Sequence, residues 1–317
     1  MATAHRPLAG RRGQLAGLGG ELSAVRVLVT GASGQLGAEV VEELARRSGA
    51  ARRGGGLDVL AADHAHLDVT DRDAVLGVLD TFAPDVVIHS AAFTAVDECE
   101  REPGRAFAVN ALGTRHVAEG CRLAGAHLTY VSTDYVFDGE KATAYCEWDL
   151  PNPRSVYGAS KLGGERELGA EATIVRTSWV CGSRGANIVK TALRLLGAGV
   201  APLRFVDDQR GSPTIASDLA VALCDLALAR RPGLFHVTNS GATSWYGFVR
   251  AVARFAGYPE GRVEPITTAE LDPPRPAPRP ANSVLENAAL VASGLALLPP
   301  WEESTERLVA LLGASRG

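Results

Sequence analysis

Short apolar runs alternate with longer amphipathic segments along most of the chain. The short runs are rich in valine and lack a polar face, which is typical of strands that are buried on both sides of a sheet. They cover residues 24–30, 57–62, 85–88, 126–131 and 173–180. The segments between them have helical periodicity, and the longest extends from about residue 103 to 123. This alternation predicts an α/β fold with a doubly wound parallel sheet, in which ligands bind at the carboxyl ends of the strands.

Beyond residue 181 the pattern predicts a smaller region of different character. An apolar helix is expected to begin at Asn187, and a short apolar strand ends near His236, which we interpret as a packed or capping histidine. A terminal amphipathic helix is predicted over 301–312. The first 24 residues have no continuous apolar segment, so we interpret them as a flexible leader rather than a signal peptide.

The composition excludes several classes of function. The 317 residues carry a formal net charge of -4, so nothing favours a nucleic-acid partner, and no apolar run approaches the length of a membrane span. The five cysteines include no Cys-x-x-Cys pair, which indicates free thiols in a reducing compartment and no zinc site. We therefore expect a cytoplasmic protein.

A glycine-rich turn follows the first predicted strand at once. Gly31, Gly34 and Gly37 form a Gly-x-x-Gly-x-x-Gly pattern between that strand and the next helix. Glycines let the backbone approach a pyrophosphate closely, and the helix N-terminus attracts the anion. The context predicts a dinucleotide-binding turn, although the spacing differs from the Gly-x-Gly-x-x-Gly of many dehydrogenases.

Further polar or small residues follow the other predicted strands. Asp63 ends the second strand, where a dinucleotide fold holds the ribose hydroxyls; a surface acid is an equally good interpretation. Asp63 would favour NADH over NADPH, but His64 and His66 weaken that inference. Asp68 and Val69 are candidates for contact with the adenine.

The third and fourth strands end in small and hydroxyl-bearing residues. Ala91, Ala92 and Thr94 leave room for a cofactor against the backbone, and Ser132 and Thr133 bring hydroxyl groups to the same edge of the sheet. Asn110 lies within the long helix that follows the third strand. The sequence therefore predicts a polar site where these strand ends meet.

Tyr157 and Lys161 are four residues apart, so they share one face of a predicted helix. An ammonium group near a phenol favours the phenolate, and such a pair is suited to moving a proton on and off a carbonyl or hydroxyl oxygen. Taken alone, the pair is a weak signal and is more typical of an exposed helix surface. The adjacent hydroxyl residues and the glycine turn favour the catalytic interpretation.

The chain resembles the short-chain dehydrogenase/reductase superfamily, in its extended Rossmann-fold branch, and within it the dTDP-4-dehydrorhamnose reductase family. The motifs that carry this resemblance are the glycine turn, Phe93-Thr94-Ala95-Val96-Asp97, residues 132–137 and 157–165, Arg176-Thr177-Ser178-Trp179-Val180, residues 208–214 and residues 279–283. The likeness extends from about Val25 to Leu312. It implies a dinucleotide-binding domain of residues 25–181 plus about 214–240 and a smaller substrate-binding region of residues 182–213 plus 241–312.

The resemblance implies reduction by NADPH or NADH of the C4 ketone of a dTDP-linked 4-keto-6-deoxy sugar. Tyr157 would donate the proton, Lys161 would hold the nicotinamide ribose, and Thr133 would bind the ketone oxygen or Tyr157. The implied cofactor site consists of Gly31, Ser33, Gly34, Gln35, Leu36, Asp63, Asp68, Val69, Ala91, Ala92, Thr94, Asn110, Tyr157 and Lys161. The implied substrate site consists of Val96, Thr133, Asp134, Trp179, Asn187, Arg210, Arg279 and Asn282.

Some implied roles have competing interpretations. Asn187 is expected to cap its helix, to bind the substrate phosphates, or both. Arg279 suits bidentate contact with a pyrophosphate, whereas Arg210 is the weaker candidate and either arginine could serve solubility alone. Without the family likeness, Trp179 would be interpreted as a core residue.

The sequence also bears on metal binding, oligomeric state and alternative functions. Some members of the family dimerise through magnesium held by glutamates; Glu39 occupies one such position, but the full set is absent, so no required metal is predicted. Both a monomer and a homodimer are compatible with the sequence. Two other functions stay open, namely a reductase of another nucleotide-linked keto or aldehydo deoxysugar, of the dihydrostreptose type, and a non-catalytic nucleotide-binding regulatory subunit.

Overall fold

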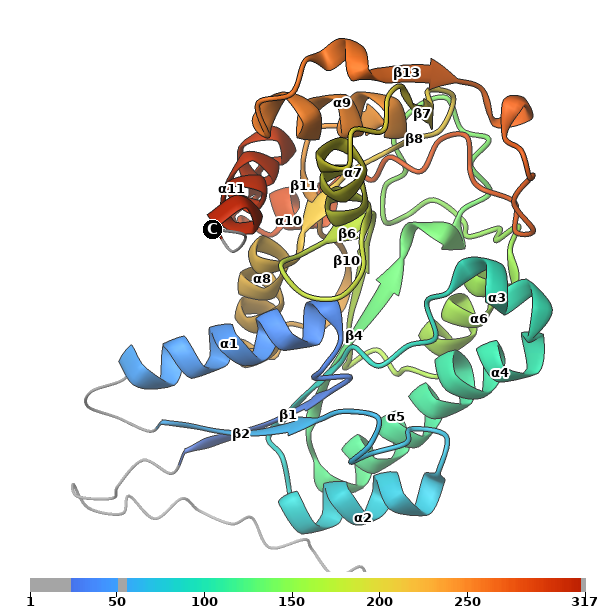
Figure 1. Ribbon diagram of the computed structural model, residues 1–317. Coiled ribbons are helices and arrows are strands. Elements are labelled where there is room, and N and C mark those ends of the chain that lie inside the picture. The colour runs from blue at the N-terminus through green and yellow to red at the C-terminus, as the bar shows by residue number, and fades with distance from the viewer. Residues whose placement is uncertain (1–23, 51–55, 315–317) are drawn as a thin grey trace, which may run out of the picture.

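A parallel sheet of six strands forms the centre of the computed structural model, which describes residues 24–50 and 56–314 (Figure 1). The strand order is β10-β5-β4-β3-β1-β2, and every neighbouring pair is parallel. These strands are β1 (Val25–Thr30), β2 (Leu57–Ala62), β3 (Val86–His89), β4 (His127–Thr133), β5 (Thr173–Thr177) and β10 (Gly233–His236). Because the chain passes from β1 to β2 on one side and to β3 on the other, a crevice is expected between the carboxyl ends of β1 and β3. The predicted fold class is confirmed.

Helices cover both faces of this sheet. On one face α1 packs against α8, and on the other α2 packs against α5, as Figure 1 shows. The helices of this part are α1 (Gln35–Ala50), α2 (Arg72–Phe82), α3 (Val96–Arg101), α4 (Pro103–Phe107), the π-helical turn η1 (Ala108–Leu112), α5 (Gly113–Ala124), the 3-10 turn η2 (Asp134–Val136), α6 (Val156–Glu165) and α8 (Ala216–Leu228). Alternate residues of β1 enter opposite cores, since Val27 and Val29 pack with Leu223 while Leu28 packs with Leu79.

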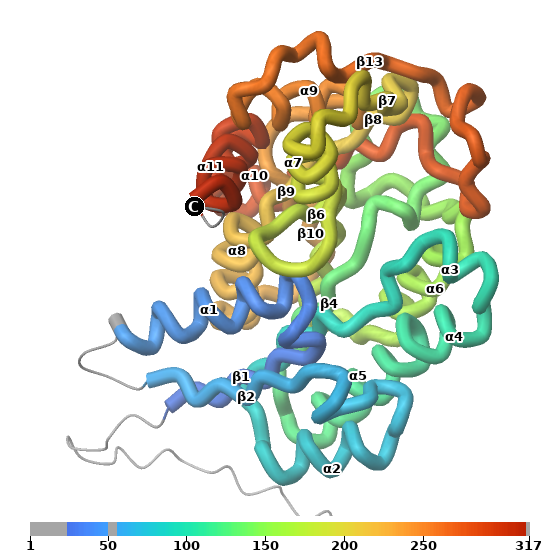
Figure 2. The backbone as a smooth tube through the Cα atoms, viewed as in Figure 1, coloured from blue at the N-terminus to red at the C-terminus, as the bar shows by residue number. Residues whose placement is uncertain are grey.

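The second, smaller set of elements lies beyond the carboxyl ends of the strands, in the upper part of Figure 2. Its helices are α7 (Ile188–Gly197), α9 (Trp245–Phe255), η3 (Glu260–Arg262), η4 (Thr268–Glu270), α10 (Ala288–Ala292) and α11 (Trp301–Ala314). Its strands are β6 (Val180–Cys181), β7 (Leu203–Val206), β8 (Arg210–Gly211), β9 (Thr214–Ile215), β11 (Asn239–Ser240), β12 (Thr243–Ser244), β13 (Val263–Ile266) and β14 (Leu298–Pro300). A separate core unites α7, α9 and α11 around the fully buried Phe248.

Two predicted elements differ from the structure. The strand expected over 173–180 ends at Thr177, because Trp179 has a φ of 48°, in the left-handed region that a strand cannot accommodate. The long helix expected over 103–123 exists but contains the π-turn Ala108–Leu112.

The leader and most of the glycine–arginine segment after α1 lie outside the described residues. The division into two domains stays a prediction, and Leu290 and Leu298 pack with the core of the main sheet. No helix among the described residues is long and apolar enough to cross a bilayer.

A buried ion pair joins α6 to the sheet. Arg176 of β5 donates from Nε and Nη2 to the two carboxylate oxygens of Glu165, at 2.8 and 2.6 Å. Their side chains are only 3% and 7% exposed, and the Ser132 hydroxyl of β4 also donates to Glu165. The pair therefore fixes the carboxyl end of α6 to two neighbouring strands.

Arg176→Ala should lower the free energy of unfolding by about 3–5 kcal/mol, because it leaves the Glu165 carboxylate buried without its partner. The matched control is Arg115→Ala, which removes a bidentate but half-exposed pair with Glu167 and should cost less than about 1 kcal/mol. Urea unfolding measures both values. Equal losses in the two variants would contradict the assignment.

Candidate active site

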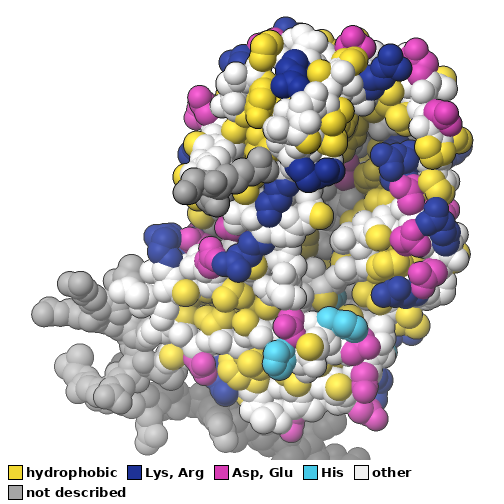
Figure 3. All heavy atoms as spheres, in the orientation of Figure 1, with side chains coloured by type: hydrophobic (Ala, Val, Ile, Leu, Met, Phe, Trp, Pro, Cys, Tyr) yellow, Lys and Arg dark blue, Asp and Glu magenta, His cyan; other side chains and the backbone are white. Residues whose placement is uncertain are grey.

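One cavity of about 480 Å³ opens at the carboxyl ends of the strands. It reaches from the glycine turn past the ends of β3 and β4 to α6 and to the beginning of α9. In the space-filling view, the surface is hollowed between the upper part and the main body of the protein (Figure 3). Its position is the one that the strand order predicts for a ligand.

The glycine turn forms one end of this cavity. Gly31 has a φ of 67°, and a Cβ there would lie 2.7 Å from the backbone nitrogen of Ala91, so only glycine fits between the ends of β1 and β3. Gln35 links the turn to the smaller region, since its Nε2 donates to the carbonyl of Val180 at 2.8 Å. Asn187 donates to Gln35 Oε1 at 2.7 Å. The turn is therefore held open toward the cavity by contacts with both parts of the chain.

Thr133, Tyr157 and Lys161 meet at the wall formed by β4 and α6. Ser155 caps α6, and its hydroxyl accepts a hydrogen bond from the Gly158 N–H at 3.1 Å, which fixes the first turn that carries Tyr157. The Thr133 hydroxyl lies beside Tyr157, whose pKa it lowers, and donates to Asp134 Oδ1 at 3.0 Å. A phenol, an aliphatic hydroxyl and an amine thus share one surface, which suits proton transfer to a ligand oxygen.

Lys161 is almost completely buried at the base of this wall. Its Nζ donates to the carbonyl of Val131 at 2.7 Å and lies 4.1 Å from the centre of the Tyr130 ring. Burial lowers the pKa of Lys161 to about 7, although the charge of Glu165 opposes this shift. His89 lies in the same buried layer, and burial lowers its pKa to about 3, so its ring is neutral.

Burial also controls the acidity of the other polar groups in the site. It raises the pKa of Tyr157 well above that of a free phenol, and the Thr133 hydrogen bond only partly offsets this rise. That Lys161 biases Tyr157 toward ionisation stays a prediction. Burial raises the pKa of Asp134 to about 6, and its Oδ2 has no hydrogen-bond partner among the described residues.

Twelve of the predicted site residues line the cavity. They are Gly31, Gly34, Gln35, Leu36, Ala92, Thr94, Val96, Thr133, Asp134, Tyr157, Lys161 and Trp179. Ala91 meets the glycine turn through its backbone, and Ser33 is exposed in that turn. The predicted convergence of the strand ends and α6 on one cavity is therefore present in the structure.

The other predicted cofactor residues lie outside the cavity lining. Asp63 Oδ1 contacts His66 Nδ1 at 2.6 Å, and this contact lowers the pKa of Asp63. Asp68 accepts hydrogen bonds from the N–H and hydroxyl groups of Thr70, and Val69 is buried against α5. Asn110 is also buried, and its amide bonds both backbone groups of Phe93 and the Ser160 hydroxyl. Asn110 thus braces the loop after β3 against α6.

Four predicted substrate residues also lie outside the cavity lining. Asn187 caps α7 by accepting from the Lys190 N–H at 3.1 Å, which confirms the predicted cap. Arg279 forms a bidentate ion pair with Asp97 at 2.6 and 2.9 Å. Asn282 donates to the carbonyls of Lys141 and Thr143, and Arg210 is exposed on β8. Glu39, considered for magnesium, accepts from the Ser183 hydroxyl at 2.7 Å.

Several cavity residues were not among the predicted site residues, and three of them carry aromatic or hydroxyl groups of interest. Tyr135 lies edge-on to Tyr157 with ring centroids 5.5 Å apart, Ser178 follows β5, and Trp245 stacks on Trp179 with centroids 3.6 Å apart. Tyr135 and Ser178 belong to two motifs named above, residues 132–137 and Arg176-Thr177-Ser178-Trp179-Val180. Their positions just after β4 and β5 could have identified them as site residues. Trp245 carried no such signal beyond a serine cap before it.

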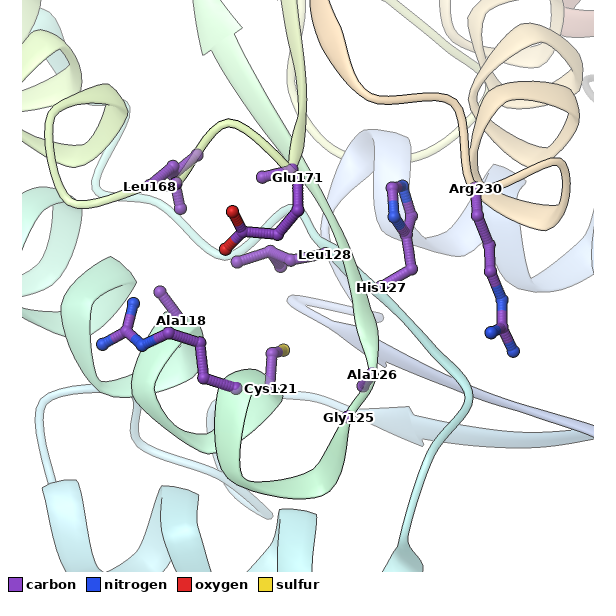
Figure 4. Close-up of a pocket in the computed structure, with 12 residues that line it drawn as sticks. Ala118, Cys121, Gly125, Ala126, His127, Leu128, Leu168, Glu171 and Arg230 are labelled. Atoms are coloured by element: carbon purple, nitrogen blue, oxygen red, sulfur yellow. The ribbon is translucent and has the colours of Figure 1, made fainter. Parts of the chain in front are cut away.

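A second cavity of about 420 Å³ lies at the opposite edge of the sheet, beside the beginnings of β4 and β5. Figure 4 shows His127 and Arg230 on one side of it and Cys121 and Glu171 on the other. It contains none of the predicted site residues.

Comparisons with known proteins give relatives along nearly the whole chain. The profile of the family "RmlD substrate binding domain" matches residues 25–313. The chain is 42% identical over 298 residues to a dTDP-4-dehydrorhamnose reductase of Streptomyces griseus, covering 91% of this chain and 94% of that one. It is 40% identical over 273 residues to the spore coat polysaccharide biosynthesis protein SpsK of Bacillus subtilis, covering 85% and 92%. The crystal structure of a dTDP-4-dehydrorhamnose reductase from Bacillus anthracis with NADP superposes with a TM-score of 0.84 at 38% identity, covering 91% and 99%.

Lys161→Met should remove a dependence of stability on pH. The pKa of Lys161 is about 7 in the folded protein and 10.5 in a free lysine, so between these values the unfolded chain binds more protons. The free energy of unfolding therefore rises with pH over this range. The contribution of the neutral amine is present at high pH and is lost as the pH falls through 7.

Urea unfolding at pH 7 and pH 9, without ligands, measures this effect. Relative to the variant, the wild type should gain roughly 2 kcal/mol of unfolding free energy between the two pH values. A difference between wild type and variant that does not change with pH would contradict the low pKa.

Proposed function

The chain belongs to the RmlD substrate-binding-domain family of dTDP-4-dehydrorhamnose reductases, and from this premise we propose that it reduces the C4 ketone of a dTDP-linked 4-keto-6-deoxy sugar with NADPH or NADH. The proposed product from dTDP-4-dehydrorhamnose is dTDP-L-rhamnose. The observation that carries the proposal is the single cavity that contains the glycine turn, Thr133, Tyr157 and Lys161. A reductase needs these parts together, whereas a plain binding module needs only the turn.

The residues at the glycine end fit a dinucleotide. The tight approach of Gly31 to Ala91 places the glycine turn beside the cavity, which the beginning of α1 also lines, and a helix N-terminus there suits a pyrophosphate. When bound, a reduced nicotinamide supplies the hydride. Asp63 would receive the adenosine ribose, with Asp68 and Val69 near the adenine, and His66 beside Asp63 tempers repulsion of a 2′-phosphate.

Tyr157 is the proposed proton donor to the ketone oxygen. Its raised pKa keeps the phenol protonated at neutral pH, so it is ready to give a proton but not to hold a negative charge. Lys161 lines the cavity and would bind the nicotinamide ribose. Its protonated amine would also stabilise the negative charge that develops on Tyr157 as the proton leaves. Thr133 would orient the ketone oxygen or Tyr157 through its hydroxyl.

The proposed sugar site lies between Val96, Asp134 and Trp179, which line the cavity on the side of the smaller region. Arg279 is retained as a proposed pyrophosphate ligand. It would then have to leave Asp97, its present partner, or share it with Arg275, which lies 3.8 Å from the same carboxylate. Asn187, Arg210 and Asn282 also stay proposed substrate contacts, and their side chains, like that of Arg279, lie outside the cavity lining.

A second candidate keeps the chemistry and changes the sugar. The 40% identity to a protein named for spore coat polysaccharide biosynthesis supports this reading, since relatives of this similarity carry different pathway names. A nucleotide-binding regulatory role is the third candidate. The presence of Thr133, Tyr157 and Lys161 in one cavity favours an enzyme over that role.

The proposals also cover the oligomeric state, the cellular location and the metal requirement. A monomer or a homodimer and a cytoplasmic location are retained, and all five cysteines are free thiols, which suits a reducing compartment. We retain the proposal that no metal is required. Among the described residues, no group of three or more His, Cys, Asp or Glu side chains is placed to hold a metal ion.

Oxidation of NADPH and of NADH by the purified chain, followed by absorbance, tests the proposed function. dTDP-4-dehydrorhamnose should be turned over faster than other nucleotide-linked 4-keto sugars. Preference for another keto or aldehydo sugar would support the second candidate. Absence of turnover with every sugar by folded, cofactor-binding protein would leave only the regulatory role.

Tyr157→Phe should reduce kcat by roughly 10²–10⁴-fold, because it removes the proton donor and leaves the ring in place. The dissociation constant of NADPH should stay near the wild-type value. Tyr246→Phe is the matched control, since Tyr246 lies outside the cavity lining and should have little effect. Full activity of the Tyr157 variant would reassign the acid.

A further inference from the structure

We propose that Trp245 is a positioning residue for the sugar, because it holds the indole of Trp179 in place as the apolar wall of the cavity. The inference rests on the proposed function, since it concerns where the sugar of that reaction lies. Trp245 is the first residue of α9, and Trp179 follows the end of β5. The two residues therefore join the smaller region to the main sheet across the cavity that both of them line.

The two indoles form a close parallel stack. Their ring centroids are 3.6 Å apart and their planes differ by only 7°. Both side chains are partly exposed, because each also faces the cavity. The stacked indoles thus line the same cavity as the hydroxyl and phenol groups of Thr133 and Tyr157.

Trp179 depends on its neighbours for its conformation. Its φ of 48° lies in the left-handed region, which is disfavoured for any residue with a large side chain and persists only where the surroundings hold it. The indole also lies directly against β8, since a Cβ on Gly211 would come within 2.4 Å of Trp179 Cε2. Only glycine at 211 leaves room for the ring.

Trp245, in contrast, is anchored from its own side. Ser244 caps α9 by accepting from the Gly247 N–H at 3.0 Å, and Thr243 and Ser244 pair with Gly211 and Arg210 of β8. The Trp245 ring also contacts Phe248, which is fully buried in the core of the smaller region and packs against Trp301. Trp245 is therefore tied to the core of the smaller region, and its stack with Trp179 extends that support to Trp179.

The chemistry of the two walls identifies the part of the ligand that each would take. The C–H face and the methyl group of a 6-deoxy sugar lack hydrogen-bonding groups, so they suit the indole face. The ketone oxygen and the ring hydroxyls suit Thr133, Asp134 and Tyr157. Loss of the support would let Trp179 move and would weaken sugar binding while the cofactor end of the cavity stayed intact.

Four tryptophans allow a controlled test with the full chain. The variants Trp245→Ala and Trp245→Phe are to be compared with the control Trp148→Phe. Trp148 is 70% exposed and lies outside the cavity lining. Stacked indoles give an exciton couplet in far-ultraviolet circular dichroism, which reports the pair without any assay of activity. KM for the dTDP-linked keto sugar, kcat and the dissociation constant of NADPH are then measured for each variant.

Trp245→Ala should lose the couplet and raise KM for the sugar nucleotide roughly tenfold, as expected for the loss of one aromatic contact, with NADPH affinity unchanged. Trp245→Phe should have a KM close to that of the wild type, because a phenyl ring still supports Trp179. Trp148→Phe should match the wild type in every measurement. A couplet that survives Trp245→Ala would overturn the stack. A lost couplet with unchanged KM would overturn the positioning role. An inactive wild type, in contrast, would contradict the proposed function itself.

Discussion

The buried ion pair between Glu165 and Arg176 is the contact on which the geometry of the site depends. It joins α6, which carries Tyr157 and Lys161, to β5, and the Ser132 hydroxyl extends the link to β4, which ends in Thr133. A buried charge pair requires good geometry to offset the loss of hydration, so it tolerates few alternative arrangements of the helix on the sheet. This attachment holds α6, and with it Tyr157 and Lys161, beside the end of β4.

A second consequence of burial is chemical. The same layer that fixes α6 removes water from Lys161, His89 and Tyr157, which lowers the pKa of the amine and the imidazole and raises that of the phenol. The neutral forms are therefore favoured throughout the base of the cavity. A site of this kind is prepared to receive the charge and the hydrogen-bonding groups of a ligand, whereas the stacked indoles of Trp179 and Trp245 add an apolar surface to the same cavity.

Much of the fold could be predicted from local pattern. The valine-rich strands, the glycine turn and the cap at Asn187 are encoded within a few residues each, and parallel strands must end at one edge of their sheet. The convergence of Thr133, Tyr157 and the glycine turn followed from that rule. The break after Thr177 and the π-turn at Ala108–Leu112 could not be predicted, because contacts with distant segments produce them.

The sequence by itself thus determined the class of fold, the family and most of the residues that line the cavity, since periodicity and motif spacing are properties of neighbouring residues. Only the tertiary structure decided that Asn110 braces a loop, that Arg279 pairs with Asp97 and that Trp245 supports Trp179. It also decided that burial raises the pKa of Tyr157. Burial and pairing between distant elements set these features, because the loss of water around a group depends on the whole fold and not on its neighbours along the chain.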